Sequence, residues 1–81
     1  MNLDILRKEI DRVDDKIAAL LKQRMTLSLQ VAQAKRGSGG PVYRPERERE
    51  ILDRLRLPPA LEAVYAAIFQ ASRELQQEVM E

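Results

Sequence analysis

The sequence contains no cysteine, no histidine and no tryptophan. Without cysteine and histidine there is no disulfide, no thiolate nucleophile, no zinc site of the usual kind and no imidazole for acid–base catalysis. Only one Phe and two Tyr are present, so a core must be built mainly from aliphatic side chains. Any catalysis would therefore have to rely on positioning and electrostatics.

The sequence also lacks a long apolar run and a strong net charge. Its longest apolar stretch is far too short to span a membrane, and the N-terminal segment MNLDILRKEID has no apolar signal core. The 14 basic and 13 acidic residues are interleaved and give a net charge of +1, which argues against a nucleic-acid partner. We expect a soluble cytoplasmic protein that binds neither membrane nor nucleic acid.

Glycine and proline are absent before Gly37, so nothing interrupts a first helix over residues 3–36. Nine positions in this segment are spaced alternately by three and four residues and would form one helix face, which we call the seam. The seam consists of Leu3, Leu6, Ile10, Val13, Ile17, Leu20, Arg24, Leu27 and Val31. Such a helix spans about 50 Å. It is longer than a domain of this mass is wide, so it needs partners along its length.

Arg24 is the one seam residue that is not aliphatic. A guanidinium group stays protonated and is costly to bury unless an anion meets it. Two interpretations are open. In one, Arg24 pairs with a buried carboxylate or fixes the register of paired helices; in the other, it binds an anionic ligand.

The remaining glycines and prolines divide the rest of the chain into a loop and two helices. The loop is expected over residues 37–44, where the glycines gather. A second helix is expected over 45–56 and a third over 59–80, each opened by a proline at its first position. We predict an all-α fold in which residues 1–81 form a single domain with a long, a short and a medium helix.

Several polar side chains lie on or beside the apolar faces of these helices. Taken singly, each has an ordinary interpretation as a solvated charge or a satisfied helix hydroxyl. Packing of the helices would gather them in a polar pocket inside a bundle, a known location for ligand sites. Because arginine and lysine predominate, such a pocket suits a carboxylate or phosphate ligand. The residues are Arg7, Arg24, Lys35, Arg47, Glu48, Ser72 and Gln76.

Five short motifs, in this order and at this spacing, resemble those of the small all-helical chorismate mutases. They are LRKEID at 6–11 with Asp14, LLKQR at 20–24, VAQAK at 31–35, VYRPERE at 42–48 and SRELQ at 72–76. The resemblance covers nearly the whole chain. It implies an intertwined homodimer in which the first helices pair and the active sites are shared. It also implies an isomerase of aromatic amino acid biosynthesis that converts the dianion chorismate to prephenate by an intramolecular Claisen rearrangement, without a cofactor or a metal.

The resemblance implies four catalytic residues: Lys35, Gln76, Arg24 and Glu48. Lys35 and Gln76 would donate hydrogen bonds to the ether oxygen, where negative charge develops as the C–O bond breaks. Glu48 would accept a hydrogen bond from the ring hydroxyl. Arg24 would bind one substrate carboxylate, and Arg7 would reach the other carboxylate across the dimer interface.

Three further substrate-binding positions follow from the same resemblance. Arg47 and Ser72 would help to fix the ring and a carboxylate. Arg44 stands where relatives often carry an acidic residue, so a contact through its backbone N–H is expected rather than one through its side chain. The apolar walls that hold the compact conformer of the substrate would be Val31, Ile51 and Phe69.

Other functions remain open from the sequence alone. One is a regulatory mutase-like domain that has no activity of its own or is active only with a partner. Another is a pyruvate lyase that acts on isochorismate in a similar pocket. A third is a plain helical dimerisation module in which Arg24 sets the register. Fusion to, or docking on, another enzyme of aromatic biosynthesis is compatible with the resemblance, as is a stand-alone short enzyme.

Overall fold

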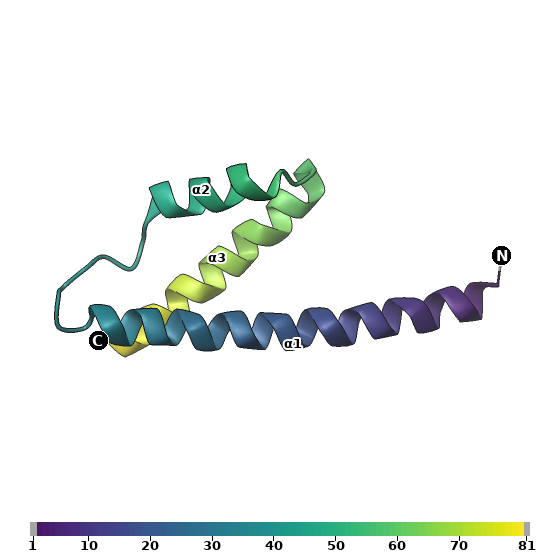
Figure 1. The fold of residues 1–81 in the computed structure, drawn as a ribbon, viewed down its shortest axis with the longest axis horizontal. Coiled ribbons are helices and arrows are strands. Elements are labelled where there is room, and N and C mark those ends of the chain that lie inside the picture. The colour runs from purple at the N-terminus through teal and green to yellow at the C-terminus, as the bar shows by residue number, and fades with distance from the viewer. Residues whose placement is uncertain (1, 81) are drawn as a thin grey trace.

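The computed structural model describes residues 2–80 and contains three α-helices (Figure 1). Helix α1 spans Leu3–Lys35, α2 spans Pro45–Leu55 and α3 spans Pro59–Met80, and no strand occurs among the described residues. The predicted all-α fold with a long, a short and a medium helix is confirmed. The molecule measures 55 × 23 × 16 Å because α1 extends well beyond the other two helices (Figure 1).

Helix α1 begins and ends at local signals in the sequence. The side-chain oxygen of Asn2 accepts hydrogen bonds from the backbone N–H groups of Asp4 (2.9 Å) and Ile5 (3.3 Å), which caps the N-terminus. At the other end, the N–H of Gly39 donates to the carbonyl of Lys35 at 3.0 Å. Gly39 has a φ of 71°, a left-handed conformation that glycine adopts without strain.

Proline opens both shorter helices. Pro45 begins α2 and Pro59 begins α3, positions at which a missing backbone N–H removes no helical hydrogen bond. Helix α2 ends before Arg56, which takes a left-handed conformation with φ 52° and donates its N–H to the carbonyl of Leu52. The reversal at Arg56 turns the chain so that α3 runs back beneath α2 toward α1 (Figure 1).

Helix α3 holds the molecule together. It packs against α1 on one side and against α2 on the other, whereas no Cα atom of α1 lies within 8 Å of a Cα atom of α2. The buried apolar residues are few, and each helix supplies one: Ala32, Ile51 and Phe69. Two serines, Ser28 and Ser72, are also buried where α1 and α3 meet. This arrangement leaves a gap between α1 and α2.

The aliphatic residues of the α1 seam are not the ones buried against α3. Ser28 and Ala32 of α1 are buried, whereas the eight aliphatic seam residues are each 39–64% exposed. The chain has an accessible surface of 6551 Å², while a compact monomer of its mass would expose about 5,000 Å². A long aliphatic stripe is thus uncovered in the single chain. None of the helices in residues 2–80 is long and apolar enough to cross a membrane.

Candidate functional site

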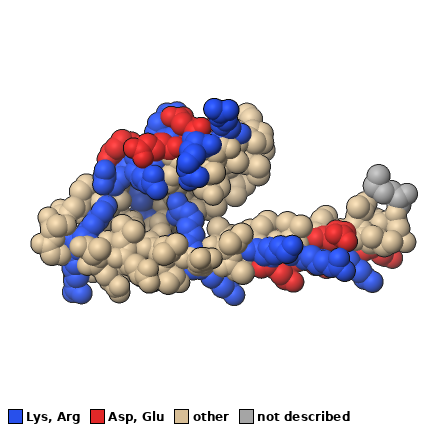
Figure 2. Space-filling model, viewed as in Figure 1, with Lys and Arg blue, Asp and Glu red and all other residues tan. Residues whose placement is uncertain are grey.

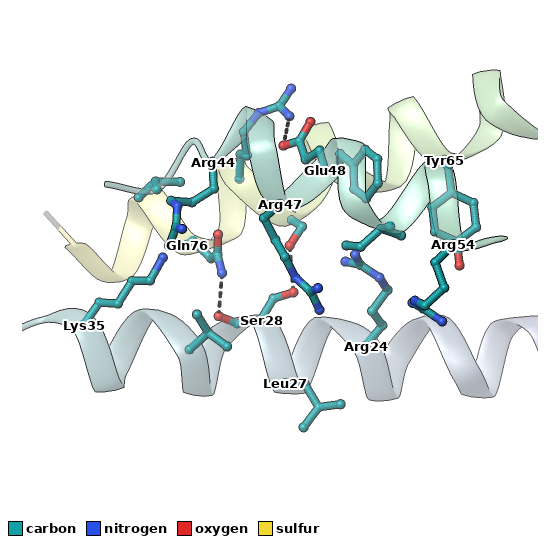
Figure 3. A pocket seen from close by; sticks show the side chains of 16 residues that line it. Arg24, Leu27, Ser28, Lys35, Arg44, Arg47, Glu48, Arg54, Tyr65 and Gln76 are labelled. Carbon is teal, nitrogen blue, oxygen red and sulfur yellow. Dashed lines mark hydrogen bonds and ion pairs between the residues drawn. The ribbon is translucent and has the colours of Figure 1, made fainter. Parts of the chain in front are cut away.

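A pocket of about 350 Å³ lies between α1, α2 and α3 (Figure 3). It exists because α1 and α2 both pack on α3 but not on each other. Its volume falls within the range of small-molecule sites. The residues that line it are Arg24, Leu27, Ser28, Val31, Lys35, Val42, Arg44, Arg47, Glu48, Ile51, Arg54, Tyr65, Phe69, Ser72, Arg73 and Gln76.

The lining of the pocket is strongly cationic. Residues 2–80 supply six basic side chains to it and a single carboxylate, that of Glu48. Figure 2 shows Lys and Arg side chains gathered in the hollow between α2 and α1. Because the whole chain has a net charge of only +1, positive charge is concentrated at this pocket. An anionic ligand is therefore the favoured occupant. The basic residues are Arg24, Lys35, Arg44, Arg47, Arg54 and Arg73.

Arg24 projects from α1 into this pocket (Figure 3). Its guanidinium carbon lies 5.6 Å from the centroid of the Phe69 ring, a cation–π contact between α1 and α3. No carboxylate within residues 2–80 lies at ion-pairing distance from it. The interpretation of Arg24 as one half of a buried ion pair thus finds no partner among residues 2–80. A guanidinium presented to a pocket and lacking a carboxylate suits an anionic ligand.

Lys35 and Gln76 lie near each other in the pocket, although they are 41 residues apart in the sequence (Figure 3). The ammonium of Lys35 donates to the backbone carbonyl of Pro41 at 3.2 Å. The side-chain amide of Gln76 donates to the carbonyl of Ser28 at 3.0 Å. An ammonium has three donor hydrogens and an amide has two. Each group is therefore held by one hydrogen bond and keeps donor capacity for a ligand.

Ser72 meets Ser28 across the contact between α1 and α3. Their hydroxyl oxygens are 2.7 Å apart and both residues are buried. One hydroxyl donates to the other, so one of the two O–H groups is not consumed by the pair. That remaining hydrogen is available to a ligand, because both serines line the pocket.

The α2 residues of the site are held by ion pairs. Glu48 accepts from Arg73 of α3 at 2.5 Å, while Arg47 is 3.3 Å from Glu50 of its own helix. Arg44 donates to Glu46, and this hydrogen bond, together with the backbone N–H of Glu46 itself, holds the pKa of the Glu46 carboxyl below its usual value. The guanidinium of Arg44 is thus bound to Glu46, although the residue also lines the pocket.

Seven of the eight site residues predicted from the sequence line this one pocket, and so do the three predicted apolar walls. The seven are Arg24, Lys35, Arg44, Arg47, Glu48, Ser72 and Gln76; the walls are Val31, Ile51 and Phe69. Arg7 does not line it. It precedes Arg24 by 17 residues of the same helix, or about 25 Å along the axis. Within one chain, Arg7 cannot act on a ligand held by Arg24.

Three polar lining residues were not predicted from the sequence: Ser28, Arg54 and Arg73. All three share a helix face with a predicted residue: Ser28 is four residues after Arg24, and Arg54 is seven after Arg47. Arg73 is four residues after the predicted wall residue Phe69 and three before Gln76, so it shares a face of α3 with both. Its place in the site depends on how α3 packs against α2.

Metal-binding potential is weak in the part of the chain that the structure describes. Residues 2–80 contain no group of three or more His, Cys, Asp or Glu side chains placed to hold a metal ion. The chemistry that this pocket offers is accordingly hydrogen bonding and charge, supplied by arginine, lysine, serine and glutamine.

The sequence is similar to those of known proteins. The family model described as chorismate mutase type II matches residues 6–77. The chain is 43% identical over 65 residues to a bifunctional chorismate mutase/prephenate dehydratase of Aquifex aeolicus, covering 79% of this chain and 17% of that protein. It is 45% identical over 51 residues to a chorismate mutase of Methanocaldococcus jannaschii, covering 63% and 52%. It is 40% identical over 52 residues to an intracellular chorismate mutase of Mycobacterium tuberculosis, covering 64% and 50%. The chain thus spans about half the length of the shorter relatives.

Proposed function

The chain belongs to the type II chorismate mutase family, and from this premise we propose that it rearranges chorismate to prephenate. One observation carries the proposal. Arg24, Lys35 and Gln76 are far apart in the sequence but line one cationic pocket, and each retains the capacity to donate hydrogen bonds there. The resemblance of the sequence motifs to the family implies substrate binding by the same three residues.

The chemistry of the substrate matches the composition of the pocket. Chorismate is a dianion with two carboxylates and an enolpyruvyl ether. In the rearrangement the ether C–O bond breaks as a C–C bond forms within the same molecule, and the protein need not transfer a proton. Catalysis therefore requires that the substrate be held in its compact conformer and that charge developing on the ether oxygen be stabilised. A pocket lined by six basic side chains, in a chain without cysteine or histidine, suits that task.

The residues on α1 and α3 would act on the charged parts of the substrate. Arg24 binds one carboxylate with its planar guanidinium, which is well suited to two parallel hydrogen bonds. Lys35 and Gln76 donate to the ether oxygen, whose negative charge is greatest in the transition state. Interactions that strengthen as the bond breaks raise kcat rather than merely improving binding. Their proximity in the pocket supports this division of labour.

The residues on α2 and its N-terminal flank would fix the ring. Glu48 accepts from the ring hydroxyl, and Arg47 and Ser72 help to hold the ring and a carboxylate. Arg44 contributes its backbone N–H, which donates to no backbone carbonyl in the described chain, while its side chain remains with Glu46. Apolar contacts hold the substrate in its compact shape; they come from Val31, Ile51 and Phe69.

A homodimer completes the proposal. The exposed aliphatic residues of the seam form an apolar stripe from Leu3 to Val31 that is interrupted at Arg24. The chain exposes roughly 1,500 Å² more surface than the scaling for a compact monomer allows. Pairing of two α1 helices along their seams would cover these side chains. It would also carry Arg7 of each chain toward the pocket of the other, which accounts for its distance from Arg24 within one chain.

Turnover of chorismate is the direct test. Purified protein should convert chorismate to prephenate, measured as loss of chorismate absorbance and as formation of prephenate by chromatography. No conversion under conditions in which circular dichroism shows folded helices would contradict the proposal. Adding candidate aromatic-pathway enzymes to the same assay distinguishes a partner-activated domain. Offering isochorismate and measuring pyruvate distinguishes a lyase.

Replacement of Arg24 by leucine separates the enzyme from a plain dimerisation module. In a module, removing a charge from an apolar seam stabilises the paired helices and changes no other property. In an enzyme, Arg24→Leu raises or maintains stability but removes a substrate carboxylate contact, which we expect to lower kcat/KM at least 100-fold. Sedimentation, thermal unfolding and chorismate turnover of the same preparation provide the comparison. Retention of full turnover would exclude the carboxylate role.

A further inference from the structure

The ion pair between Arg73 and Glu48 differs from every other ion pair in residues 2–80. It joins two helices, α3 and α2, with a separation of 2.5 Å, and its side chains are only 33% and 22% exposed. The other pairs link residues two or three apart in the sequence, with side chains 45–73% exposed. Exposed pairs of that kind contribute little, whereas a half-buried pair is less screened and holds its partners more firmly.

Arg73 is held on a second side by the loop before α2. Its guanidinium carbon lies 5.0 Å from the centroid of the Tyr43 ring, within the range of a cation–π contact. The guanidinium therefore contacts the Glu48 carboxylate and the face of Tyr43. Three segments of the chain converge on it: α3, α2 and the loop.

Among residues 2–80, Glu48 supplies the only carboxylate that lines the pocket, together with six basic side chains. A carboxylate on a flexible side chain in such surroundings has several cations to which it could turn. The hydrogen bond from Arg73 goes to its Oε2 atom. Among residues 2–80, no group donates a hydrogen bond to Oε1 of Glu48. A carboxylate oxygen accepts up to two hydrogen bonds, so Oε1 retains its full accepting capacity.

We propose that Arg73 is a positioning residue: it holds Oε2 of Glu48 so that Oε1 is presented to the ring hydroxyl of the substrate, and Tyr43 keeps the guanidinium in place. The inference rests on the proposed mutase function, and it adds a residue whose effect passes through Glu48. The alternative is that Arg73 merely ties α3 to α2 and contributes stability alone.

A double-mutant cycle separates these roles. Arg73→Met removes the charge and keeps an unbranched side chain; Glu48→Gln removes the accepting charge. We expect Arg73→Met to lower kcat/KM for chorismate roughly 10- to 100-fold, as loss of one hydrogen bond to a charged group does. In the Glu48→Gln background the same substitution should change kcat/KM less than about 3-fold, because the partner through which it acts is gone. Arg49→Met, on α2 outside the pocket, is the matched control and should leave turnover unchanged.

Equal losses from Arg73→Met in both backgrounds would overturn the inference, and so would full activity of the single variant. Circular dichroism and thermal unfolding of every variant show whether a loss comes from unfolding. If Arg73→Met does not fold, the cycle is run with Arg73→Lys. That variant keeps the charge but lacks the planar fork, and it should show a smaller loss that again disappears without Glu48. Inactivity of the unaltered protein would count instead against the proposed function.

Discussion

Replacing Lys35 with alanine should lower kcat for chorismate by about 100- to 1,000-fold, the effect typical of removing one donor to a developing oxyanion. The ammonium of Lys35 is held by the carbonyl of Pro41, and Gly40 lies against its aliphatic stem, where an added Cβ atom would be 3.4 Å from Cδ. The donor is thus positioned before the substrate arrives. Because charge on the ether oxygen peaks in the transition state, KM should change much less than kcat.

The control for this prediction is Lys22→Ala, which removes an exposed lysine of the same helix that does not line the pocket. Initial rates over a range of chorismate concentrations give kcat and KM for both variants. A Lys35→Ala variant that loses less than a few-fold in kcat would show that the ether oxygen is stabilised by other groups. A variant with raised KM and unchanged kcat would assign Lys35 to ground-state binding.

Mixing two inactive variants should restore activity if the site is shared. Arg7→Ala chains keep Lys35, and Lys35→Ala chains keep Arg7. A heterodimer of the two contains one intact site and one site that lacks both groups. Random exchange at equal concentrations places half the chains in heterodimers, so about a quarter of the activity of the unaltered protein should return. Such recovery from two inactive preparations is a large signal, and it requires Arg7 to act on the partner's substrate.

Subunit exchange must be demonstrated in the same samples, for example by mass spectrometry of chains with different tags. Mixing Lys35→Ala with Gln76→Ala is the matched control: both groups lie in the pocket of one chain, so the mixed dimer contains no intact site. Verified exchange without recovery in the Arg7 experiment would rule out a site that uses Arg7 from the second chain. Activity of Arg7→Ala on its own would show that turnover does not require Arg7.

The number and type of secondary-structure elements could be predicted because glycine and proline occur only near the ends of the helices. Pro45 and Pro59 begin helices in the structure, as the sequence indicated. The C-terminal ends of α1 and α2 were harder to predict. The sequence predicts helices that end at about residues 36 and 56, whereas Lys35 ends α1 and Leu55 ends α2, with Arg56 in a left-handed conformation. A left-handed arginine could not be anticipated, since glycine or asparagine normally occupies that position.

Packing, rather than secondary structure, limited the prediction of the site. The seam spacing identified the most apolar face of α1, but that face is exposed in the single chain, and α3 packs on the neighbouring face around Ser28 and Ala32. A helix can use two faces, and periodicity alone reports only the more apolar one. The contact between Arg73 and Glu48 was likewise inaccessible, because it depends on the rotation of α3 relative to α2.

The scarcity of buried apolar residues has a consequence for how a bound ligand affects the stability of the chain. Each helix contributes one such residue, and the space between the three helices is a pocket lined by charged side chains. A ligand that touches α1, α2 and α3 would occupy the volume that hydrophobic side chains fill in other small domains. The bound molecule would then be a transient part of the protein interior. A ligand that holds the three helices together stabilises the folded chain, but it must also leave after each turnover. Tighter packing around the ligand would therefore increase stability and slow the release of product.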